Sequence, residues 1–375
     1  MRLLKSFLLP VLGAACLQQA AAQAPKPRTE NVVLITLDGM RWQEVFGGAD
    51  TTLFKQSKHY YSDRKSLQTL FGQSSTEQRR QALMPFLWST VVKQGQVYGN
   101  RNLGSLVNVT NNQWFSYPGY NEILTGAADN ARIHSNDPLP NPNVTVLEKL
   151  NQQPAFKGKV AAFGSWQVFP AIINEQRSGL PVNAGTDGAD GPGLSAQEQL
   201  LDHMMAATPS PFGDERLDSF TGQYALEYVK RKKPRVLFVS FGDTDEFAHE
   251  GEYGAYLHSA HYTDMLIRQL WEYLQSDPQY KGKTTLLITT DHGRGAAAEG
   301  KWRDHGAKIP GADQIWLAAL GPDTAPTGEA NTGQLYQNQV AATLAQLLGA
   351  PFTPPSAGGA SISPIVGKNN AVGKN

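Results

Sequence analysis

Three short runs of aliphatic and β-branched residues constrain the fold of this chain more than any other feature. They occupy residues 31–37, 236–241 and 284–290. Each run is almost continuously hydrophobic and does not alternate with polar residues, which is typical of strands buried on both faces of a parallel sheet. A chain that buries such strands needs helices on both sides of them.

Segments of helical length and amphipathic pattern lie between and after these runs. The expected helices cover residues 82–93, 145–151, 195–207, 219–230, 253–274 and 337–348. Because strands and helices alternate, we predict an α/β fold with a doubly wound, mostly parallel sheet and helices on both faces. Two polar stretches, residues 47–80 and 174–194, interrupt this pattern, and we interpret them as surface insertions that could close over a substrate.

The composition narrows the chemistry that this fold can carry. Of the 375 residues, 40% are hydrophobic, which is enough for a sizeable core. The 33 Lys and Arg residues balance the 33 Asp and Glu residues, so the net charge gives no reason to expect nucleic acid or an anionic membrane as a partner. A single cysteine excludes an internal disulfide and a thiolate cluster. A bound metal would therefore be held by histidines and carboxylates.

The two ends of the chain are expected to lie outside the catalytic domain, which we assign to residues 23–353. Residues 1–22 combine basic residues, a short apolar run and three alanines, the layout of a secretory signal peptide that is too short to span a bilayer. We therefore expect export to the periplasm or the medium. Cys16 follows Gly-Ala-Ala, which resembles a bacterial lipoprotein box without its leucine, so a lipid anchor at Cys16 is the alternative. The Gly/Ser/Pro-rich residues 354–375 predict a flexible tail.

Aspartates follow all three hydrophobic runs. Asp38 follows the first run, Asp243 and Asp245 follow the second, and Asp291 follows the third. In open α/β sheets the ligand crevice lies beyond the carboxyl ends of the strands, so we expect these acids to converge although they are far apart in sequence. A single aspartate at such a position is usually a helix cap. Several converging carboxylates instead require a cation.

Three histidines accompany these acids. His249 lies four residues after Asp245, which places both on one face of a helix, and His292 is adjacent to Asp291. His305 precedes a glycine in an expected loop. Together these residues provide enough nitrogen and oxygen ligands for two divalent ions, and zinc is the first choice for such a mixed set. The candidate ligands are Asp38, Asp245, His249, Asp291, His292 and His305.

Residues 116–126 supply a candidate nucleophile. Ser116 stands where a helix would begin, Pro118 occupies an early helical position, and Gly126 stands near the expected helix end. A serine at a helix N-terminus lies beside free N–H groups and the positive end of the helix dipole, a place that suits a phosphate. The alternative interpretation is that Ser116 only caps the helix.

In this order, the motifs resemble those of the alkaline phosphatase superfamily, and within it the nucleotide pyrophosphatase/phosphodiesterase-like branch. That branch carries an Asp after the first strand, a nucleophile followed by an aromatic residue and Pro, a Thr-Gly, an Asp-x-x-x-His, an Asp-His-Gly and a late His-Gly. The matching residues are Asp38, Ser116-Tyr117-Pro118, Thr125-Gly126, Asp245 with His249, Asp291-His292-Gly293 and His305-Gly306. The resemblance covers about residues 31–348 and implies a phosphomonoesterase or phosphodiesterase that acts on a small phosphoester.

The resemblance also implies a role for each residue. The implied ligands are Asp245, His249 and His305 for one zinc ion, and Asp38, Asp291, His292 and the Ser116 oxygen for the other. Ser116 would attack phosphorus to form a phosphoseryl intermediate. Water activated by the zinc ion at Asp245, His249 and His305 would then hydrolyse this intermediate. Asn136 would donate a hydrogen bond to the phosphate. Arg294, close in sequence to the ligands, could bind a second anionic group of the substrate.

Departures from the family pattern leave alternatives open. Ser116 stands where the diester-cleaving branch usually carries threonine, so the preference between monoesters and diesters stays open. Sulfatases of the superfamily carry a C/S-x-P-x-R motif and paired aspartates after the first strand, whereas this chain has Tyr120 in place of the arginine and Gly39 after Asp38. Phosphoglycerate mutases of the superfamily are cytosolic and carry a large inserted domain. A sulfatase, a mutase-like enzyme and a non-catalytic binding protein on this fold are the alternatives.

Overall fold

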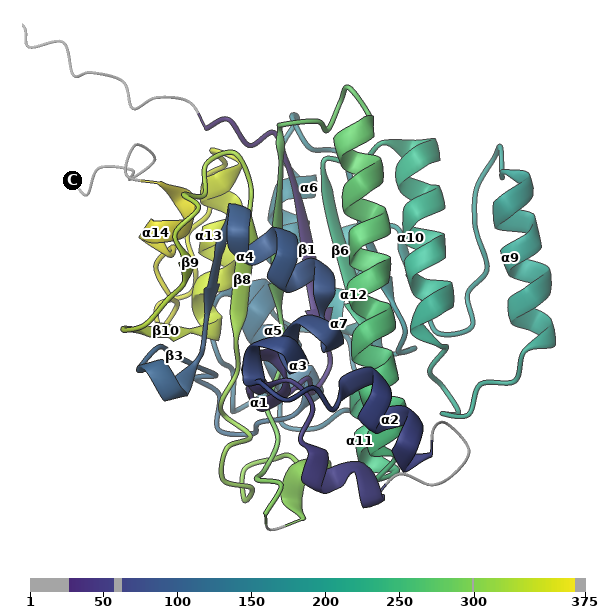
Figure 1. Ribbon diagram of the computed structural model, residues 1–375. Coiled ribbons are helices and arrows are strands. Elements are labelled where there is room, and N and C mark those ends of the chain that lie inside the picture. The colour runs from purple at the N-terminus through teal and green to yellow at the C-terminus, as the bar shows by residue number, and fades with distance from the viewer. Residues whose placement is uncertain (1–26, 57–62, 299, 368–375) are drawn as a thin grey trace, which may run out of the picture.

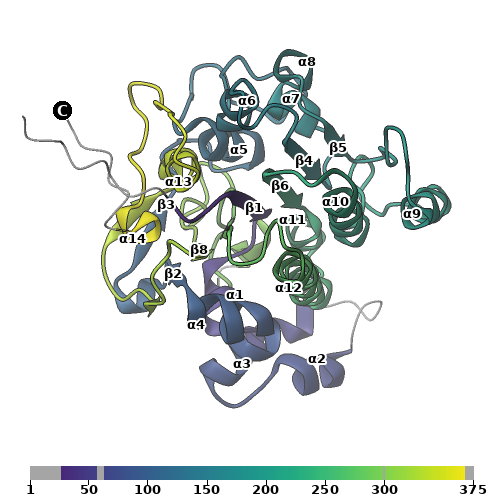
Figure 2. The ribbon, with the colours of Figure 1, turned by 90° about the horizontal axis from the view of Figure 1, so that it is seen from above.

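The computed structural model describes residues 27–56, 63–298 and 300–367. The expected signal peptide, including Cys16, lies outside this described part. A central sheet lies between two layers of helices (Figures 1 and 2). This arrangement confirms the predicted α/β fold, with a mostly parallel sheet and helices on both faces.

Within the described residues, the central sheet has eight strands in the order β5-β4-β6-β1-β7-β8-β2-β9. In chain order they are β1 (Asn31–Leu37), β2 (Gln96–Tyr98), β4 (Val160–Gly164), β5 (Val182–Ala184), β6 (Val236–Phe241), β7 (Thr284–Thr289), β8 (Leu317–Leu320) and β9 (Gly328–Glu329). The strands from β5 to β7 are parallel, whereas β8 runs antiparallel to its neighbours β7 and β2. A smaller sheet pairs β3 (Leu106–Asn108) with β10 (Gln334–Tyr336).

The three predicted strands are confirmed as β1, β6 and β7, and they lie side by side with β1 in the middle. Leu37 at the end of β1 pairs with Phe241 at the end of β6, so the neighbouring strands end level with each other. Val33 belongs to the core on one face of the sheet, and Val32 and Leu34 belong to the core on the other. Burial on both faces explains why these runs are continuously hydrophobic.

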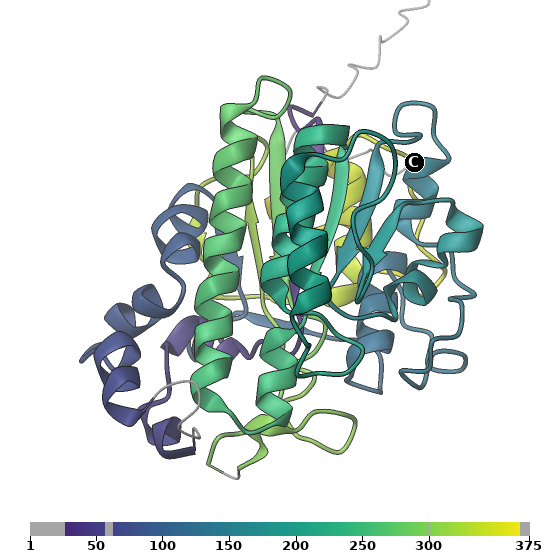
Figure 3. The same ribbon diagram turned by 90° about the vertical axis from the view of Figure 1, so that its right-hand side faces the viewer.

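One helix layer packs on each face of the sheet (Figure 2). The first contains α1 (Trp42–Gly47), α2 (Arg64–Phe71), α3 (Thr76–Leu83), α4 (Val92–Gln94), α10 (Asp218–Lys232), α11 (Asp243–His249) and α12 (Tyr253–Ser276). The second contains α5 (Ser116–Thr125), α6 (Val146–Asn151), α7 (Phe169–Ile173), α8 (Glu175–Ser178), α13 (Val340–Leu347) and α14 (Ser363–Val366). Figure 3 shows α10 and α12 side by side over the sheet, and α9 (Ala196–Ala207) packs on α10.

Short helical turns complete the structure. They are η1 (Thr51–Gln56), the π-helix η2 (Leu87–Val91), η3 (Arg101–Leu103), η4 (Lys301–Arg303) and η5 (Gln337–Gln339). The helices predicted over residues 145–151, 195–207, 219–230 and 253–274 are confirmed as α6, α9, α10 and α12. The helix predicted over residues 337–348 begins as the 3-10 turn η5 and continues as α13. None of the helices in the described ranges is both long and apolar enough to cross a membrane.

The single helix predicted over residues 82–93 is wrong. The helix α3 ends at Leu83, and a second helical segment starts at Pro85 and continues as η2. Proline has no N–H group and disfavours helical geometry in the residue before it. The N–H groups of Phe86 and Leu87 donate instead to the carboxylate of Asp264 on α12, over 2.7 and 2.8 Å. A side chain from a distant part of the chain therefore caps the second segment.

Replacing Asp264 with asparagine is expected to destabilise the fold. Asparagine offers one acceptor oxygen in place of two, so one buried N–H group loses its partner at a cost of about 1–3 kcal/mol. Burial raises the pKa of Asp264 to about 7. Between about pH 4 and pH 7 the folded chain therefore holds a proton that the unfolded chain releases, and this group lowers the free energy of unfolding as the pH rises. The variant should lose this contribution to the pH dependence.

Urea unfolding of both proteins, at the two ends of that pH window, measures both effects. An exposed aspartate replaced in the same way, Asp137→Asn, serves as the control. Equal free energies of unfolding for the Asp264 variant and the parent would show that this cap does not stabilise the fold.

The two stretches interpreted as surface insertions are parts of the packed domain. The described residues between 47 and 80 form η1, α2 and the start of α3, and they bury Phe54 and Phe71 in the core on one face of the sheet. Residues 174–194 form α8 and then β5, the edge strand that pairs in parallel with β4. Both stretches are polar in composition, so the sequence alone does not reveal their few contacts with the core and the sheet. These contacts depend on neighbouring elements that are distant in sequence.

The described part of the predicted flexible tail is also packed. Ile362, Ile365 and Val366 in and beside α14 are at most 1% exposed and belong to the core beneath α13. The hydroxyl of Thr324 donates to the carbonyl of Ile365 over 3.0 Å, and the Ile362 N–H donates to the hydroxyl of Thr343 over 2.9 Å. The prediction of a flexible tail is therefore wrong for residues 360–367, and residues 368–375 lie outside the described part.

Candidate active site

The strands β6, β1 and β7 end at the side of the sheet where α11 begins (Figure 1). Asp38 follows β1 directly, Asp245 lies in the first turn of α11 after β6, and Asp291 is the second residue after β7. All three side chains are buried, with at most 7% of each residue exposed. The structure thus brings together Asp38, Asp245 and Asp291 as the sequence predicts. The fourth acid, Asp243, instead accepts a hydrogen bond from the Asp218 N–H over 3.1 Å.

The first group of candidate ligands surrounds His292. Its Nε2 atom lies 3.2 Å from Asp38 Oδ1 and 3.4 Å from Asp291 Oδ2, two oxygens that have no hydrogen-bond partner among the described residues. The other oxygen of each carboxylate is held in place. The Tyr120 hydroxyl donates to Asp38 Oδ2 over 2.8 Å, and the Gly39 N–H donates to Asp291 Oδ1 over 3.1 Å. Each carboxylate is thus oriented by one oxygen and presents the other to His292.

The surroundings of His292 also set its tautomer. Its Nδ1 lies 3.0 Å from the Gly293 carbonyl oxygen, so Nδ1 donates a hydrogen bond there and Nε2 is the nitrogen that faces the carboxylates. The side-chain amide of Gln337 donates to the Asp291 carbonyl over 2.6 Å and fixes the backbone beside it. One imidazole nitrogen and two free carboxylate oxygens within 4.8 Å of one another form a donor set that suits zinc or another divalent ion.

The second group lies beside the first. His249 Nε2 is 2.9 Å from Asp245 Oδ2 and 2.9 Å from His305 Nε2. The predicted i,i+4 spacing in α11 brings Asp245 and His249 together, and the loop after η4 places His305 beside them. The rings of His292 and His305 stack with their centroids 4.0 Å apart, so the two groups adjoin. The structure therefore gathers all six residues that the sequence suggests as metal ligands.

The electrostatics of the site reflect the crowding of like charges. Burial, and then the charge of Asp245, raise the pKa of Asp38 well above its usual range, and burial together with Asp38 does the same for Asp291. Burial opposes the ionisation of Asp245 as well, but the charges of Arg294 and the neighbouring histidines hold its pKa well below the usual range. Burial lowers the pKa of His305 to about 2. A divalent ion would reverse the repulsion between these carboxylates, and its binding would release protons.

Ser116 faces the first group. It is the first residue of α5, whose N-cap is the extended residue Phe115, so Ser116 is not the N-cap. Its Oγ atom lies 3.4 Å from His292 Nε2. A Cβ atom on Gly119, one turn further along α5, would lie only 2.4 Å from the Asp291 carbonyl oxygen. Glycine at this position therefore lets the helix approach the candidate ligands closely enough for Ser116 to reach them.

Asn136 lies beside the start of the same helix. Its Oδ1 atom accepts a hydrogen bond from the Tyr117 N–H over 3.0 Å, and the residue is exposed. This bond orients the side chain one residue away from Ser116. The position agrees with the predicted contact to a phosphate, which stays a prediction.

Arg294 is not where the sequence interpretation puts it. The guanidinium is fully buried and donates to the carboxylate of Asp245 and to the Asp245 carbonyl oxygen, the latter over 3.0 Å. It also donates to the carbonyl of Arg303. Its charge is therefore turned toward a candidate metal ligand and away from solvent. A direct contact between Arg294 and an anionic group of the substrate stays a prediction.

Sequence reasoning missed the partner of Asp38. It registers Tyr120 only as a departure from the sulfatase motif, whereas the structure shows that the Tyr120 hydroxyl orients Asp38. The hydroxyl of Ser240 on β6 donates to Tyr120 over 2.8 Å, and that of Thr36 on β1 donates to Ser240 over 2.9 Å. The position of Tyr120, four residues after the candidate nucleophile, is the only signal in the sequence.

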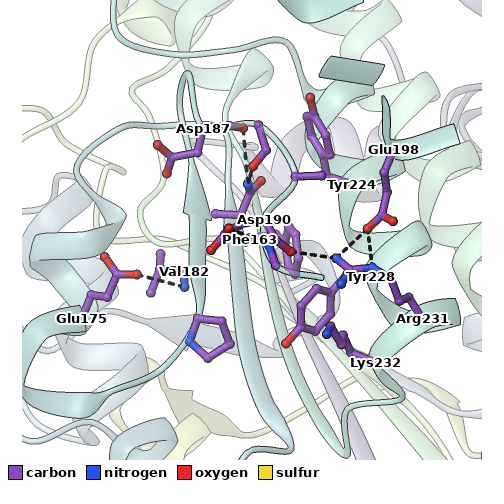
Figure 4. Close-up of a pocket in the computed structure, with 15 residues that line it drawn as sticks. Phe163, Glu175, Val182, Asp187, Asp190, Glu198, Tyr224, Tyr228, Arg231 and Lys232 are labelled. Atoms are coloured by element: carbon purple, nitrogen blue, oxygen red, sulfur yellow. Dashed lines mark hydrogen bonds and ion pairs between the residues drawn. The ribbon is translucent and has the colours of Figure 1, made fainter. Parts of the chain in front are cut away.

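A large cavity of about 570 Å³ lies elsewhere, between β5 and the helices α9 and α10 (Figure 4). Tyr224, Tyr228 and Lys232 line it, together with Arg231, which is held by the carboxylate of Glu198 over 2.9 Å. None of the predicted site residues borders this cavity. The candidate site is therefore defined by the chemistry at the strand ends and not by the size of a cavity.

Comparisons with known proteins agree with this geometry. The sequence model of the Sulfatase family matches residues 208–350, a range that contains five of the six candidate ligands but neither Asp38 nor Ser116. The fold matches that of the alkaline phosphatase PafA, with a TM-score of 0.59 over 92% of this chain and 100% of that chain, at 12% identity. The family match over part of the chain and the shared fold both support the predicted resemblance to the alkaline phosphatase superfamily. No curated protein sequence matches it.

Other solved structures of the superfamily fold span different activities. One is the lipoteichoic acid synthase LtaP from Listeria monocytogenes, with 11% identity, a TM-score of 0.55 and coverage of 91% of this chain and 75% of that chain. Another is a 2-O GAG sulfatase, with 15% identity, a TM-score of 0.54 and coverage of 90% and 73%. The superfamily contains metal-dependent hydrolases of phosphoric and sulfuric esters. The fold alone does not distinguish between these esters.

Proposed function

We propose that the protein is an exported phosphoester hydrolase that forms a phosphoseryl intermediate at a two-zinc site. The observation that carries this proposal is the position of Ser116 Oγ, 3.4 Å from His292 Nε2, where the two groups of ligands adjoin. A hydroxyl at a helix N-terminus beside six ligands for two divalent ions is the arrangement that phosphoryl transfer to serine requires. The order of the motifs along the chain supports the nucleotide pyrophosphatase/phosphodiesterase-like branch.

The residues of the chain suggest how the reaction proceeds. When bound, two divalent ions supply Lewis-acid chemistry and positive charge for a phosphoryl group. The Ser116 hydroxyl gives up its proton and its oxygen bonds to phosphorus, while the bond to the leaving oxygen breaks and that oxygen gains a proton. Water then cleaves the phosphoseryl ester, which restores serine and releases phosphate from a monoester or a phosphomonoester from a diester. The start of α5 favours negative charge beside Ser116. The Asn136 side chain, oriented through its Oδ1, has its N–H groups available for a phosphate oxygen.

Replacing Tyr120 with phenylalanine should weaken metal binding. The change removes the hydrogen bond to Asp38 Oδ2 and leaves the ring in its edge contact with Phe169. Loss of a partner that orients a metal ligand typically costs about 10–100-fold in metal affinity or activity. Titration of the metal-free variant with zinc against a competing chelator measures this change directly. Tyr262→Phe, an exposed tyrosine on α12, is the matched control, and an unchanged zinc affinity for Tyr120→Phe would contradict the role of Tyr120.

A sulfatase is the second candidate, because the matching model is that of the Sulfatase family and a 2-O GAG sulfatase is among the similar structures. The matched range contains candidate metal ligands but begins only at residue 208, well after residues 116–120, so it does not bear on the nucleophile segment. We favour phosphate because Tyr120 replaces the arginine of the sulfatase motif and Gly39 replaces its second aspartate.

One assay separates these candidates. It compares p-nitrophenyl phosphate, methyl p-nitrophenyl phosphate, p-nitrophenyl phenylphosphonate and p-nitrophenyl sulfate, which share one leaving group. We expect turnover of phosphate esters to exceed that of the sulfate ester. Faster turnover of the sulfate would overturn the proposal in favour of a sulfatase, and metal binding without turnover of any ester would support a binding protein.

Export is the part of the proposal that rests on residues 1–22, which lie outside the described residues. The basic, apolar and small-residue segments support removal of a signal peptide after Ala22, and the segment before Cys16 supports a lipid anchor as the alternative. A mature chain that keeps residues 1–22 would contradict both.

A further inference from the structure

The buried guanidinium of Arg294 has no part in the mechanism above, and yet it contacts a candidate metal ligand. Its Nη2 atom donates to the carboxylate and to the carbonyl oxygen of Asp245, and its Nη1 atom donates to the carbonyl of Arg303. Two of these partners are backbone carbonyls. The guanidinium is therefore held in place by the backbone as well as by the carboxylate.

We propose that Arg294 is a positioning residue for Asp245 and that its fixed charge makes the site select phosphate monoester dianions over diester monoanions. This inference rests on the proposed function, because it requires Asp245 to be a metal ligand. Arg294 occupies Asp245 Oδ1, and Asp245 Oδ2 faces His249 Nε2 at 2.9 Å. The pair thus leaves one defined oxygen of Asp245 for an ion shared with His249.

The chain makes room for this pair at Gly39. A Cβ atom at that position would lie 2.3 Å from Asp245 Oδ1 and 2.8 Å from Arg294 Nε. The backbone of Gly39 also has a φ angle of +58°, which favours glycine. A second aspartate directly after Asp38, as in the sulfatase pattern, therefore has no room beside the Asp245–Arg294 pair. The sulfatase pattern adds the negative charge of a second aspartate at this place, whereas this chain has the positive charge of Arg294 there.

The positive charge of Arg294 affects which substrate charge the site prefers. The three aspartates of the site are buried, and Arg294 compensates one of their negative charges. A phosphate monoester near neutral pH carries about two negative charges, whereas a diester or a sulfate ester carries one. For a fixed charge within about 10 Å and an effective dielectric constant of about 20, the extra substrate charge changes the relative rate by about tenfold. Arg294 therefore favours the monoester.

The test compares two substitutions at Arg294 with a surface control. Arg294→Met removes the charge and keeps most of the volume, whereas Arg294→Lys keeps the charge. Lys308→Met removes an exposed positive charge three residues after His305. For each zinc-loaded protein, kcat/KM is measured with p-nitrophenyl phosphate and with methyl p-nitrophenyl phosphate, and the ratio of the two values is compared.

We expect the monoester-to-diester ratio to fall about tenfold in Arg294→Met, to return most of the way in Arg294→Lys and to stay unchanged in Lys308→Met. A second readout does not depend on activity. Thermal unfolding of the metal-free Arg294→Met protein should shift to lower temperature more than that of the zinc-loaded protein, because zinc replaces the lost counter-charge of Asp245. A merely structural role for Arg294 would shift both forms equally.

The outcomes separate the two proposals. An active parent protein with the same ratio in Arg294→Met overturns the inference about the substrate, and equal thermal shifts overturn the positioning role. A parent protein that hydrolyses neither phosphate ester overturns the proposed function itself, and with it the substrate preference. If the methionine variant fails to fold, Arg294→Gln, which keeps hydrogen-bond donors without the charge, takes its place with the same expected results.

Discussion

Replacing Ser116 with alanine should abolish hydrolysis of phosphate esters while leaving the metal site loaded. The serine oxygen is the atom that would bond to phosphorus, and removal of a nucleophile costs about 10³-fold or more in kcat. The six other candidate ligands remain in this variant, so we expect its metal affinity to change little. Steady-state kinetics and metal analysis of the same preparation measure both quantities. Ser89→Ala, an exposed serine, is the matched control.

Two results would contradict the role of Ser116. Full activity in the alanine variant would show that another group is the nucleophile or that water attacks directly. Loss of activity together with loss of the metal would show that the serine is needed mainly as a ligand. In the parent protein, rapid quenching during turnover should trap phosphate on Ser116, which peptide mass spectrometry would locate.

Removing the metal should abolish activity and lower the stability of the fold. The carboxylates of Asp38, Asp245 and Asp291 are buried together, and divalent ions would offset their mutual repulsion. For each site, binding at a free metal concentration about 100 times its Kd stabilises the folded state by about 2.7 kcal/mol. Dialysis against a chelator, followed by thermal unfolding and by titration with zinc, should show a lower midpoint and then recovery with two equivalents of metal.

The stoichiometry provides the sharper test. We expect His305→Ala to bind about one zinc ion, because it removes a ligand of the second group and leaves the first intact. The exposed histidine His203 on α9 gives the matched control, and His203→Ala should still bind two. A parent protein that binds one zinc ion or none, with activity that a chelator does not change, would refute the two-zinc site.

Much of the fold could be predicted because the information for it is local. The continuous hydrophobicity of β1, β6 and β7 reports burial on both faces, and amphipathic segments report the helices that cover them. Elements whose partners are distant could not be predicted in this way. The edge strand β5 is polar enough to resemble a loop, and it becomes a strand because β4 offers it an unpaired edge. Similarly, η2 begins where it does because Asp264 accepts the N–H groups of Phe86 and Leu87.

The same distinction separates what could be predicted about the site from what could not. The six candidate ligands follow from the order of motifs, since parallel strands deliver their end residues to one edge of the sheet. The residues that orient these ligands do not follow from it. Tyr120 lies 82 residues from Asp38, and Arg294 lies 49 residues from Asp245. In the sequence, Tyr120 is only an aromatic residue in an expected helix and Arg294 only a basic residue near an expected loop, so neither is marked as the partner of a ligand.

The sequence by itself determined the superfamily resemblance, the strands of the sheet and the residue types that gather at its edge. Only the tertiary structure decided which oxygen of Asp38 and of Asp291 is held and which is free, that Ser116 faces His292, and that Arg294 is turned inward toward Asp245. The physical reason is that hydrophobic periodicity is a property of neighbouring residues, whereas the partner of a buried polar group depends on which distant segments pack together.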